Sequence, residues 1–366
     1  MSQKQVKFSI VHIDPLAQGV SKMTNKVNFV SNTLAGETGT CLTYKENKKV
    51  MFSFLKSSKD LDNISKDRID PLCPHYFQCG GCSYLHTNYE TEMNLKKDAL
   101  LWNFKNIKIP EVSIIKSEER FNYRNRIQLH FNNKENSFGY KGYDNNIINI
   151  DNCIIASKNI QNKINDAKEI IYSEGGGKGH LELFEKNNKV ELNINSKYSA
   201  GGFTQVNPKM NIKLKNYIKN YFKNISTSTI IDLFGGNGNI SEIFEYNQRT
   251  VIDIFENKQQ SDENSSFVNM NLYNEDNLKN LVAKYASIST DLLFIDPPRS
   301  GFKELNILLN EISPSYFVYI SCNNSTMARD LSQLPTNFKI TDISIFDFFP
   351  GTHHFETVVI MKKLEN

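Results

Sequence analysis

Cys322 directly follows an apolar run, residues 316–320, whose composition is that of a buried parallel strand. Ser321 comes before the cysteine and Asn323 after it, and small polar residues of this kind suit the mouth of a site. Ligand sites of open α/β sheets lie at the carboxyl ends of the strands, so Cys322 stands where a nucleophile could act. A lone cysteine is more often a buried structural residue, and only other chemical groups around it would favour catalysis.

Two carboxylates lie next to predicted strands in the same part of the chain. Asp296 follows the apolar residues 291–295 and opens the segment Asp-Pro-Pro-Arg, whose two prolines stiffen the loop. Glu356 ends the segment 350–356, directly before the last apolar strand, and is a candidate general base. A single carboxylate in a loop is usually solvated surface, so a catalytic role for Glu356 depends on its neighbours.

A glycine-rich turn follows the strand predicted over residues 229–234. Residues 235–239 read Gly-Gly-Asn-Gly-Asn, which lets the backbone approach a ligand closely while the next helix offers free N–H groups. The turn is neither Gly-x-Gly-x-x-Gly nor a lysine-containing phosphate loop, so it does not favour a dinucleotide or ATP. Asp253 or Glu256, near the end of the next strand, could bind ribose hydroxyls. A plain connection between strand and helix is the alternative.

A second group of cysteines predicts a metal site. Three of them fall in the short segment 73–82, which ends in Cys-Gly-Gly-Cys, and another follows at position 153. The glycine pair lets the backbone curl so that thiols face one centre, as zinc or an iron–sulfur cluster requires. His75 and His86 are rival ligands if the metal is zinc, and a thioredoxin-like dithiol is a further alternative. The four candidate ligands are Cys73, Cys79, Cys82 and Cys153.

The elements that must position these residues fall into three stretches. Residues 1–58 hold short alternating strands separated by Gly, Asn and Pro, which predicts a small β-barrel with a basic hairpin at 45–49. After a polar linker, residues 70–200 combine a helix from Tyr89 to about Asn106 with mainly strands. Residues 201–366 alternate strands and helices, the pattern of a doubly wound parallel α/β sheet.

Helices in this last stretch are predicted over residues 211–222, from Ile240 to Tyr246 and around 257–266. A further helix is expected to begin near Thr326.

The composition is that of an ordinary soluble protein, with 366 residues, 39% hydrophobic and 23% charged residues, and a net charge of +3. No apolar run approaches the ~20 residues that cross a bilayer, and the first residues lack the apolar segment of a signal peptide. We therefore expect no membrane association and a cytoplasmic location, where clustered cysteines indicate a metal or catalysis rather than disulfides. The net charge alone neither requires nor excludes nucleic acid.

Together these residues resemble the family of RNA uracil-5 methyltransferases that depend on S-adenosylmethionine. The resemblance covers nearly the whole chain, with the family's motifs in their usual order and at about their usual spacing. The segments that carry it are Phe203–Asn207, Asp232–Asn239, Ile295–Gly301, Ser321–Asp330 and Pro350–Glu356. It implies a Rossmann-like class I methyltransferase domain (201–366), preceded by a mainly β iron–sulfur domain (70–200) and a TRAM-like, OB-type RNA-binding barrel (1–58).

The resemblance also implies a role for each site residue. The family's nucleophile, which adds to C6 of uracil, maps onto Cys322, and the base that removes the C5 proton maps onto Glu356. Asp296 and its Pro-Pro loop would orient the uracil. The family's acidic cofactor position falls on Phe255, and Glu256 is predicted to take its place in preference to Asp253. The expected cofactor contacts are Gln205, Phe234, Asn239, Glu256, Asn271 and Asp296.

The four clustered cysteines match the family's iron–sulfur pattern, which favours a 4Fe–4S cluster over zinc. With the TRAM-like barrel, this points to 23S ribosomal RNA as substrate. We also expect a monomer that binds neither DNA nor membrane. The transfer RNA T-loop uridine is the alternative substrate, and a non-catalytic RNA-binding iron–sulfur protein is the alternative class. Arg124 and Arg126 would help to hold the RNA, although salt bridges on a sheet face would explain them equally well.

Overall fold

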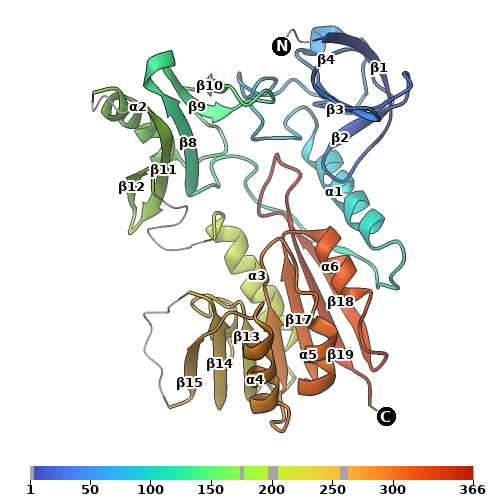
Figure 1. Cartoon of the computed structure of the whole chain (residues 1–366), viewed down its shortest axis with the longest axis vertical. Coiled ribbons are helices and arrows are strands. Elements are labelled where there is room, and N and C mark those ends of the chain that lie inside the picture. Colours follow the sequence, from blue (N-terminus) through green and yellow to red (C-terminus); the bar gives the residue numbers. More distant parts are fainter. Residues whose placement is uncertain (1–3, 174–176, 197–204, 256–262, 366) are drawn as a thin grey trace. The chain divides into compact units, whose positions relative to one another are not determined.

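The computed structural model describes residues 4–173, 177–196, 205–255 and 263–365. The chain divides into two compact units (Figure 1). The first unit consists of Met1–Ala99, Ser117–Lys209 and Phe348–His354, and the second of Leu100–Lys116, Met210–Asp347 and Phe355–Asn366. In the described part of the chain, no helix is long and apolar enough to cross a bilayer.

The first unit begins with a closed β-barrel, as the alternating N-terminal pattern predicted. Its sheet order is β1-β2-β3-β5-β4-β6, and a further pairing of β1 with β4 closes it. The strands are β1 (Lys4–Ile13), β2 (Gln18–Ser21), β3 (Val27–Ser31), β4 (Thr38–Glu46), β5 (Val50–Phe54) and β6 (Leu61–Asn63). The 3₁₀ turn η1 (Ser58–Asp60) precedes β6. Alternate side chains fill the barrel, among them Cys41, which is therefore a core residue.

The rest of the first unit is an antiparallel sheet with one covering helix. The order is β10-β9-β8-β11-β12, and α2 (Lys158–Ser173) packs on the two strands of the β11–β12 hairpin. Ile160, Ile164 and Ala167 bury one stripe of α2 at helical spacing, in a core that also contains Cys153. The strands are β8 (Arg126–Asn132), β9 (Ser137–Lys141), β10 (Ile147–Asn149), β11 (Lys178–Lys186) and β12 (Lys189–Ile194), with η2 (Asn133–Glu135) between β8 and β9.

The second unit is a Rossmann-like sheet in the order β15-β14-β13-β16-β17-β19-β18-β7. Its strands are β7 (Ser113–Ile115), β13 (Thr229–Leu233), β14 (Gln248–Asp253), β15 (Ser265–Asn269), β16 (Leu292–Ile295), β17 (Tyr316–Ser321), β18 (Phe338–Phe346) and β19 (Glu356–Lys363). The first five strands of this order are parallel, but β19 runs antiparallel to both β17 and β18. The expected parallel sheet is therefore mixed at one side.

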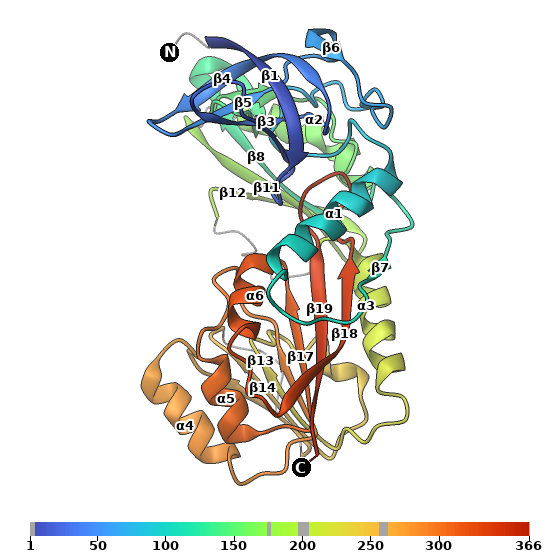
Figure 2. The ribbon, with the colours of Figure 1, turned by 90° about the vertical axis from the view of Figure 1, so that its right-hand side faces the viewer.

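Helices cover both faces of this sheet, with α4, α5 and α6 on one face and α3 on the other (Figure 2). They are α3 (Pro208–Tyr221), α4 (Glu275–Tyr285), α5 (Leu305–Ile312) and α6 (Asn324–Leu331), and α1 (Tyr89–Asn103) spans the boundary of the two units.

Two predicted helices of this unit differ from the structure. The one expected from Ile240 to Tyr246 is reduced to the short 3₁₀ turn η3 (Ser241–Ile243). The one expected around 257–266 is wrong at its end, because Ser265 begins strand β15, which pairs with β14. Its earlier part, 257–262, lies outside the described residues.

Candidate active site

The sheet register brings the predicted site residues of the second unit to one edge. Leu233 pairs with Ile295 and with Ile252, and Ile295 pairs with Tyr319, so the parallel strands end at nearly the same level. The side chains that follow these strand ends therefore meet at the carboxyl edge, where open α/β sheets bind ligands. The residues that follow directly are Phe234, Asp296 and Cys322, while Asp253 is the last residue of β14.

Glu356 reaches the same edge because its strand runs in the opposite direction. It is the first residue of β19, and the next residue, Thr357, pairs with Ser321 at the end of β17. The antiparallel insertion thus places the start of one strand beside the ends of its parallel neighbours. Glu356 is only 9% exposed, which a solvated loop carboxylate would not be.

Cys322, Glu356, Asp296 and Arg299 act on one another electrostatically. Burial and then the negative charge of Glu356 raise the pKa of the Cys322 thiol to about 11, while Arg299 opposes this by its charge and a hydrogen bond. Burial, and then the charge of Asp296, raises the pKa of Glu356, while Arg299 lowers it. The site therefore sets one guanidinium against two carboxylates around a half-buried thiol.

Arg299 is the residue of this group for which the sequence predicted no role, although it stands out as the arginine that follows Asp-Pro-Pro. Its backbone carbonyl accepts hydrogen bonds from the Asn323 side chain (2.8 Å) and from the Thr326 hydroxyl (3.2 Å). The loop after β16 is thereby tied to the start of α6, which Asn323 caps through the N–H groups of Ser325 and Thr326. The available signal was its place directly after Asp-Pro-Pro, in a loop that the two prolines stiffen.

The glycine turn after β13 is built around two carboxylates. The buried Asp232 accepts a hydrogen bond from the Ser241 hydroxyl at 2.6 Å, and a Cβ at Gly235 would lie only 2.6 Å from the Asp232 carboxyl carbon. Asp253 accepts a hydrogen bond from the Gly236 N–H at 2.9 Å. Gly236, at φ +55°, has the left-handed backbone that glycine adopts without strain.

These carboxylates make the turn acidic. Burial raises the pKa of Asp232 to about 6, although the Ser241 hydroxyl and the charge of Arg249 lower it. Burial raises the pKa of Asp296 as well, and the negative charges of Asp232 and Asp253 add to this. A cationic ligand would relieve the repulsion among the three groups.

Three further residues predicted to bind the cofactor lie in loops of the second unit. Phe234, at φ +57°, lies with its ring 5.5 Å from the rings of both Tyr273 and Phe302. Asn239 and Asn211 exchange side-chain hydrogen bonds of 3.0 and 3.1 Å. Asn271 is exposed in the loop after β15.

Two predicted cofactor residues are not part of the described edge. Gln205 belongs to the first unit, where its carbonyl accepts a hydrogen bond from Asn125. Glu256 lies outside the described residues.

The four clustered cysteines lie within the first unit and are all free thiols. Burial raises the pKa of Cys82 well above its usual value, and the charges of Cys153, Cys79 and Cys73 raise it further. Burial also raises the pKa of Cys79 to about 11, although the Gly81 N–H donates to its sulfur at 3.4 Å. Within the described ranges, no three His, Cys, Asp or Glu side chains form a group that could hold a single metal ion.

The fully buried His86 uses its Nδ1 for a short hydrogen bond with the Tyr76 hydroxyl. This nitrogen is therefore engaged by a hydroxyl group.

One predicted RNA contact is wrong. Arg126 is 2% exposed and forms a salt bridge of 3.0 Å with the buried Glu182 on the neighbouring strand β11. Its guanidinium also lies 4.7 Å from the centre of the Phe184 ring. The alternating pattern was read correctly as a strand, but it could not tell that the arginine faces the interior.

Comparisons with known proteins found similarity to RNA methyltransferases. A family model described as tRNA (uracil-5-)-methyltransferase matches residues 276–364. The 23S rRNA (uracil(1939)-C(5))-methyltransferase RlmD of Marinomonas sp. (strain MWYL1) is 26% identical over 420 residues, covering 97% of this chain and 94% of that protein. An uncharacterized RNA methyltransferase of Mycoplasma mobile is 25% identical over 374 residues, covering 98% of each chain.

A solved structure shares the fold. The crystal structure of Pyrococcus abyssi tRNA (uracil-54, C5)-methyltransferase in complex with S-adenosyl-L-homocysteine superposes with a TM-score of 0.69 at 20% identity. The match covers 97% of this chain and all of that one.

Proposed function

We propose that this chain is a member of the RNA uracil-5 methyltransferase family and that it methylates C5 of a uridine in structured RNA. S-adenosylmethionine would supply the methyl group on its positively charged sulfonium. The observation that carries the proposal is the carboxyl edge of the second unit, where Cys322, Glu356, Asp296 and Arg299 interact.

Cys322 is proposed as the nucleophile, because C5 of uracil is by itself too weak to attack a methyl group. When the Cys322 thiolate bonds to C6, the electron pair of the C5–C6 double bond moves toward C5 and O4, and C5 gains the density to attack. The charge and hydrogen bond of Arg299 support the thiolate in a site where burial opposes it. Asp296 and the stiff prolines after it would orient the uracil.

Glu356 is proposed as the base that ends the reaction. Once C5 carries the methyl group, a carboxylate oxygen of Glu356 removes the C5 proton, the C5–C6 double bond re-forms and the sulfur–C6 bond breaks. A buried carboxylate with a raised pKa is a stronger base than an exposed one and holds the proton that it accepts. Cys322 then leaves as a thiolate, ready for the next cycle.

The acidic glycine turn is proposed to bind S-adenosylmethionine. Phe234, Asn239, Asn271 and Asp296 lie on loops at the carboxyl edge, and the raised pKa of Asp232 and Asp296 favours a cationic ligand there. Gln205 and Glu256 remain proposed contacts. Asp253 is a second candidate for the ribose hydroxyls, because it ends β14 and bonds to the glycine turn.

A 4Fe–4S cluster is proposed for Cys73, Cys79, Cys82 and Cys153. The donor set fits. Burial and the charges of neighbouring cysteines raise the pKa of Cys79 and Cys82, and a bound cationic iron centre would stabilise their thiolates. A single tetrahedral zinc would draw its thiolates to about 3.8 Å from one another, given bonds of about 2.3 Å, whereas a cluster of several ions holds them farther apart.

Absorbance tests this cluster. Anaerobically purified protein should be brown, with a broad band near ~400 nm that Cys79→Ser abolishes and Cys41→Ser keeps, because Cys41 lies in the barrel core. Full zinc occupancy with no iron would contradict it.

The RNA is proposed to be 23S ribosomal RNA, with transfer RNA as the alternative. The barrel supports RNA binding through the exposed Lys45, Lys48 and Lys49 of its β4–β5 hairpin and through the stacked rings of Phe29 and Phe52, 5.5 Å apart. Transcripts of both RNAs, incubated with S-adenosylmethionine labelled in its methyl group, would identify the substrate.

Two variants test the chemistry. Cys322→Ala should abolish methyl transfer, whereas Cys41→Ala should retain it, and equal activity of both would refute the nucleophile. Glu356→Gln should accumulate a covalent protein–RNA adduct that survives a denaturing gel, because the methylated base can no longer lose its C5 proton. If the wild-type protein methylates neither RNA, the alternative of a non-catalytic RNA-binding iron–sulfur protein would be favoured.

A further inference from the structure

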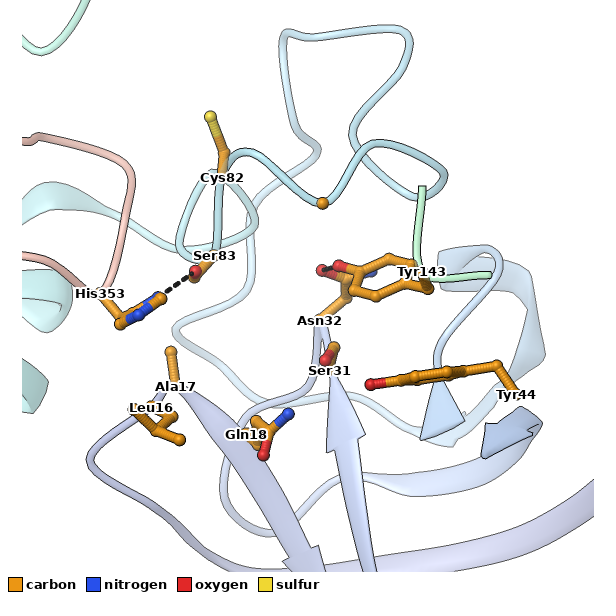
Figure 3. Close-up of a pocket in the computed structure, with 11 residues that line it drawn as sticks. Leu16, Ala17, Gln18, Ser31, Asn32, Tyr44, Cys82, Ser83, Tyr143 and His353 are labelled. Carbon is orange, nitrogen blue, oxygen red and sulfur yellow. Dashed lines mark hydrogen bonds between the residues drawn. The ribbon is translucent and has the colours of Figure 1, made fainter. Parts of the chain in front are cut away.

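The first unit contains a small pocket between its barrel and its cysteine loop (Figure 3). Its volume is about 150 Å³, which is room for a planar heterocycle. Neither Lys, Arg, Asp nor Glu is among the residues that line it, so it does not suit a phosphate. The ligand that fits such a lining is neutral and carries hydrogen-bonding groups.

Three polar side chains face this pocket without a partner in the described part of the chain. They are the amide of Gln18, the hydroxyl of Ser31 and the hydroxyl of Tyr44. All three residues are half-buried, and Gln18 and Ser31 are cross-strand partners on β2 and β3. Together they offer donors and acceptors to one edge of a flat ligand.

The aromatic wall of the pocket is held rigidly. The Tyr143 ring stacks on the Phe54 ring at 4.8 Å and lies 5.9 Å from the Tyr44 ring. The Tyr143 hydroxyl donates to the Oδ1 of the buried Asn32 at 2.9 Å, which fixes the orientation of the ring. Fixed aromatic faces bind bases of nucleic acids by stacking.

The opposite wall comes from the loop that carries the clustered cysteines. Gly80, Cys82 and Ser83 line the pocket, and the Ser83 hydroxyl is 3.1 Å from Nδ1 of His353. The backbone N–H of Ser83 donates to the Gly351 carbonyl at 2.8 Å. Whatever fixes Cys82 therefore also fixes this wall.

We propose that this pocket binds one unpaired nucleobase of the RNA, stacked against the tyrosine wall and recognised by Gln18, Ser31 and Tyr44. The base is distinct from the uridine that is methylated, and its capture selects RNA that carries a second exposed nucleotide besides the target. The proposal rests on the proposed function, which makes RNA the ligand. It also gives the cysteine loop a use in recognition, since that loop forms one wall of the pocket.

The experiment combines protein variants with RNAs that lack a single base. The probe is a 23S ribosomal RNA fragment that the wild-type protein methylates, prepared as a series in which each nucleotide in turn is abasic. Wild-type protein should lose about tenfold in affinity at one position besides the target, because stacking on an aromatic side chain contributes about 1–3 kcal/mol per base. Gln18→Leu should bind the intact RNA about fivefold more weakly and lose little more at that position.

Controls separate the pocket from the rest of the barrel. Gln5→Leu changes an exposed glutamine of β1 outside the pocket and should keep the full tenfold loss at the abasic position. Tyr44→Phe removes a single oxygen atom, so it replaces Gln18→Leu if that variant does not fold. It should likewise reduce the loss of affinity that the abasic position causes. A loss that is the same in all four proteins, or no sensitive position besides the target, would overturn the proposal. Methylation of the intact RNA, measured in parallel, shows whether the proposed function itself has failed.

Discussion

The charge balance around Cys322 makes a prediction that needs no RNA. The pKa of this thiol is about 11, so at pH 8, three units lower, about one thiol in a thousand is ionised. Arg299 lowers that pKa and Glu356 raises it. Replacing each by glutamine should therefore shift the reactivity of the thiol in opposite directions.

The size of the effect on the alkylation rate depends on two opposing changes, in the fraction of thiolate and in its nucleophilicity. Removal of a neighbouring opposite charge moves a pKa by about 1 unit or more, so Arg299→Gln reduces the thiolate about tenfold. A more basic thiolate is also more nucleophilic, by about threefold per unit, which leaves a net decrease of about threefold in the alkylation rate below the pKa. Glu356→Gln should raise the rate by a similar factor, so the two variants differ by about tenfold.

Iodoacetamide labelling over a range of pH, followed by mass spectrometry of the peptide containing Cys322, measures this directly. Cys41, buried in the barrel, is the internal reference in the same sample, and its labelling should not change. Arg299→Lys retains the positive charge and should stay closer to wild type than Arg299→Gln. If Arg299→Gln labels as fast as wild type or faster, Arg299 does not support the thiolate and its proposed role is wrong.

Three further predictions concern the carboxyl edge of the second unit, one on S-adenosylmethionine binding and two on the stability of the fold. Because the pKa of Asp232 is raised to about 6 and that of Asp296 is raised too, a cation binds best once both are ionised. Calorimetry should therefore show S-adenosylmethionine affinity falling, below each pKa, by up to about tenfold per pH unit for each of the two carboxyls that becomes protonated. S-adenosylhomocysteine lacks the sulfonium charge, and an equally steep pH dependence for it would refute this explanation. Gly301→Ala should lower the free energy of unfolding by about 2–3 kcal/mol in urea titrations, since Gly301 has φ +71° and its Cβ would lie 2.4 Å from the Asp330 carboxylate. Gly236→Ala, with φ +55° and open space around it, should cost only about 1 kcal/mol, and equal costs would contradict the predicted clash.

Local patterns in the sequence were sufficient to predict the architecture and to select candidate site residues. Alternation in residues 1–58 predicted the barrel, which the structure confirms, and apolar runs ending in polar residues identified the strands before Asp296 and Cys322. Such patterns are readable because side-chain burial repeats with the period of the element. The spacing of the cysteines likewise predicts a shared metal centre, and this stays a prediction.

Local patterns failed where burial or pairing depends on distant residues. Arg126 looked like a surface arginine on an alternating strand, and only the position of Glu182 on β11 shows that it points inward. The predicted helix around 257–266 gave way at Ser265, where β14 offers a parallel partner for a strand. Propensity is a weak guide wherever tertiary pairing decides the conformation.

The sequence by itself predicted which residues could carry the chemistry: a cysteine after a strand, a carboxylate before two prolines and a glutamate before the final strand. Only the tertiary structure decided that they act on one another. Parallel register aligns the ends of β16 and β17, and the reversed direction of β19 brings Glu356 to the same edge. The role of Arg299 beside Cys322 also emerged only there, because the range of a charge is set by distance in space and not by separation along the chain.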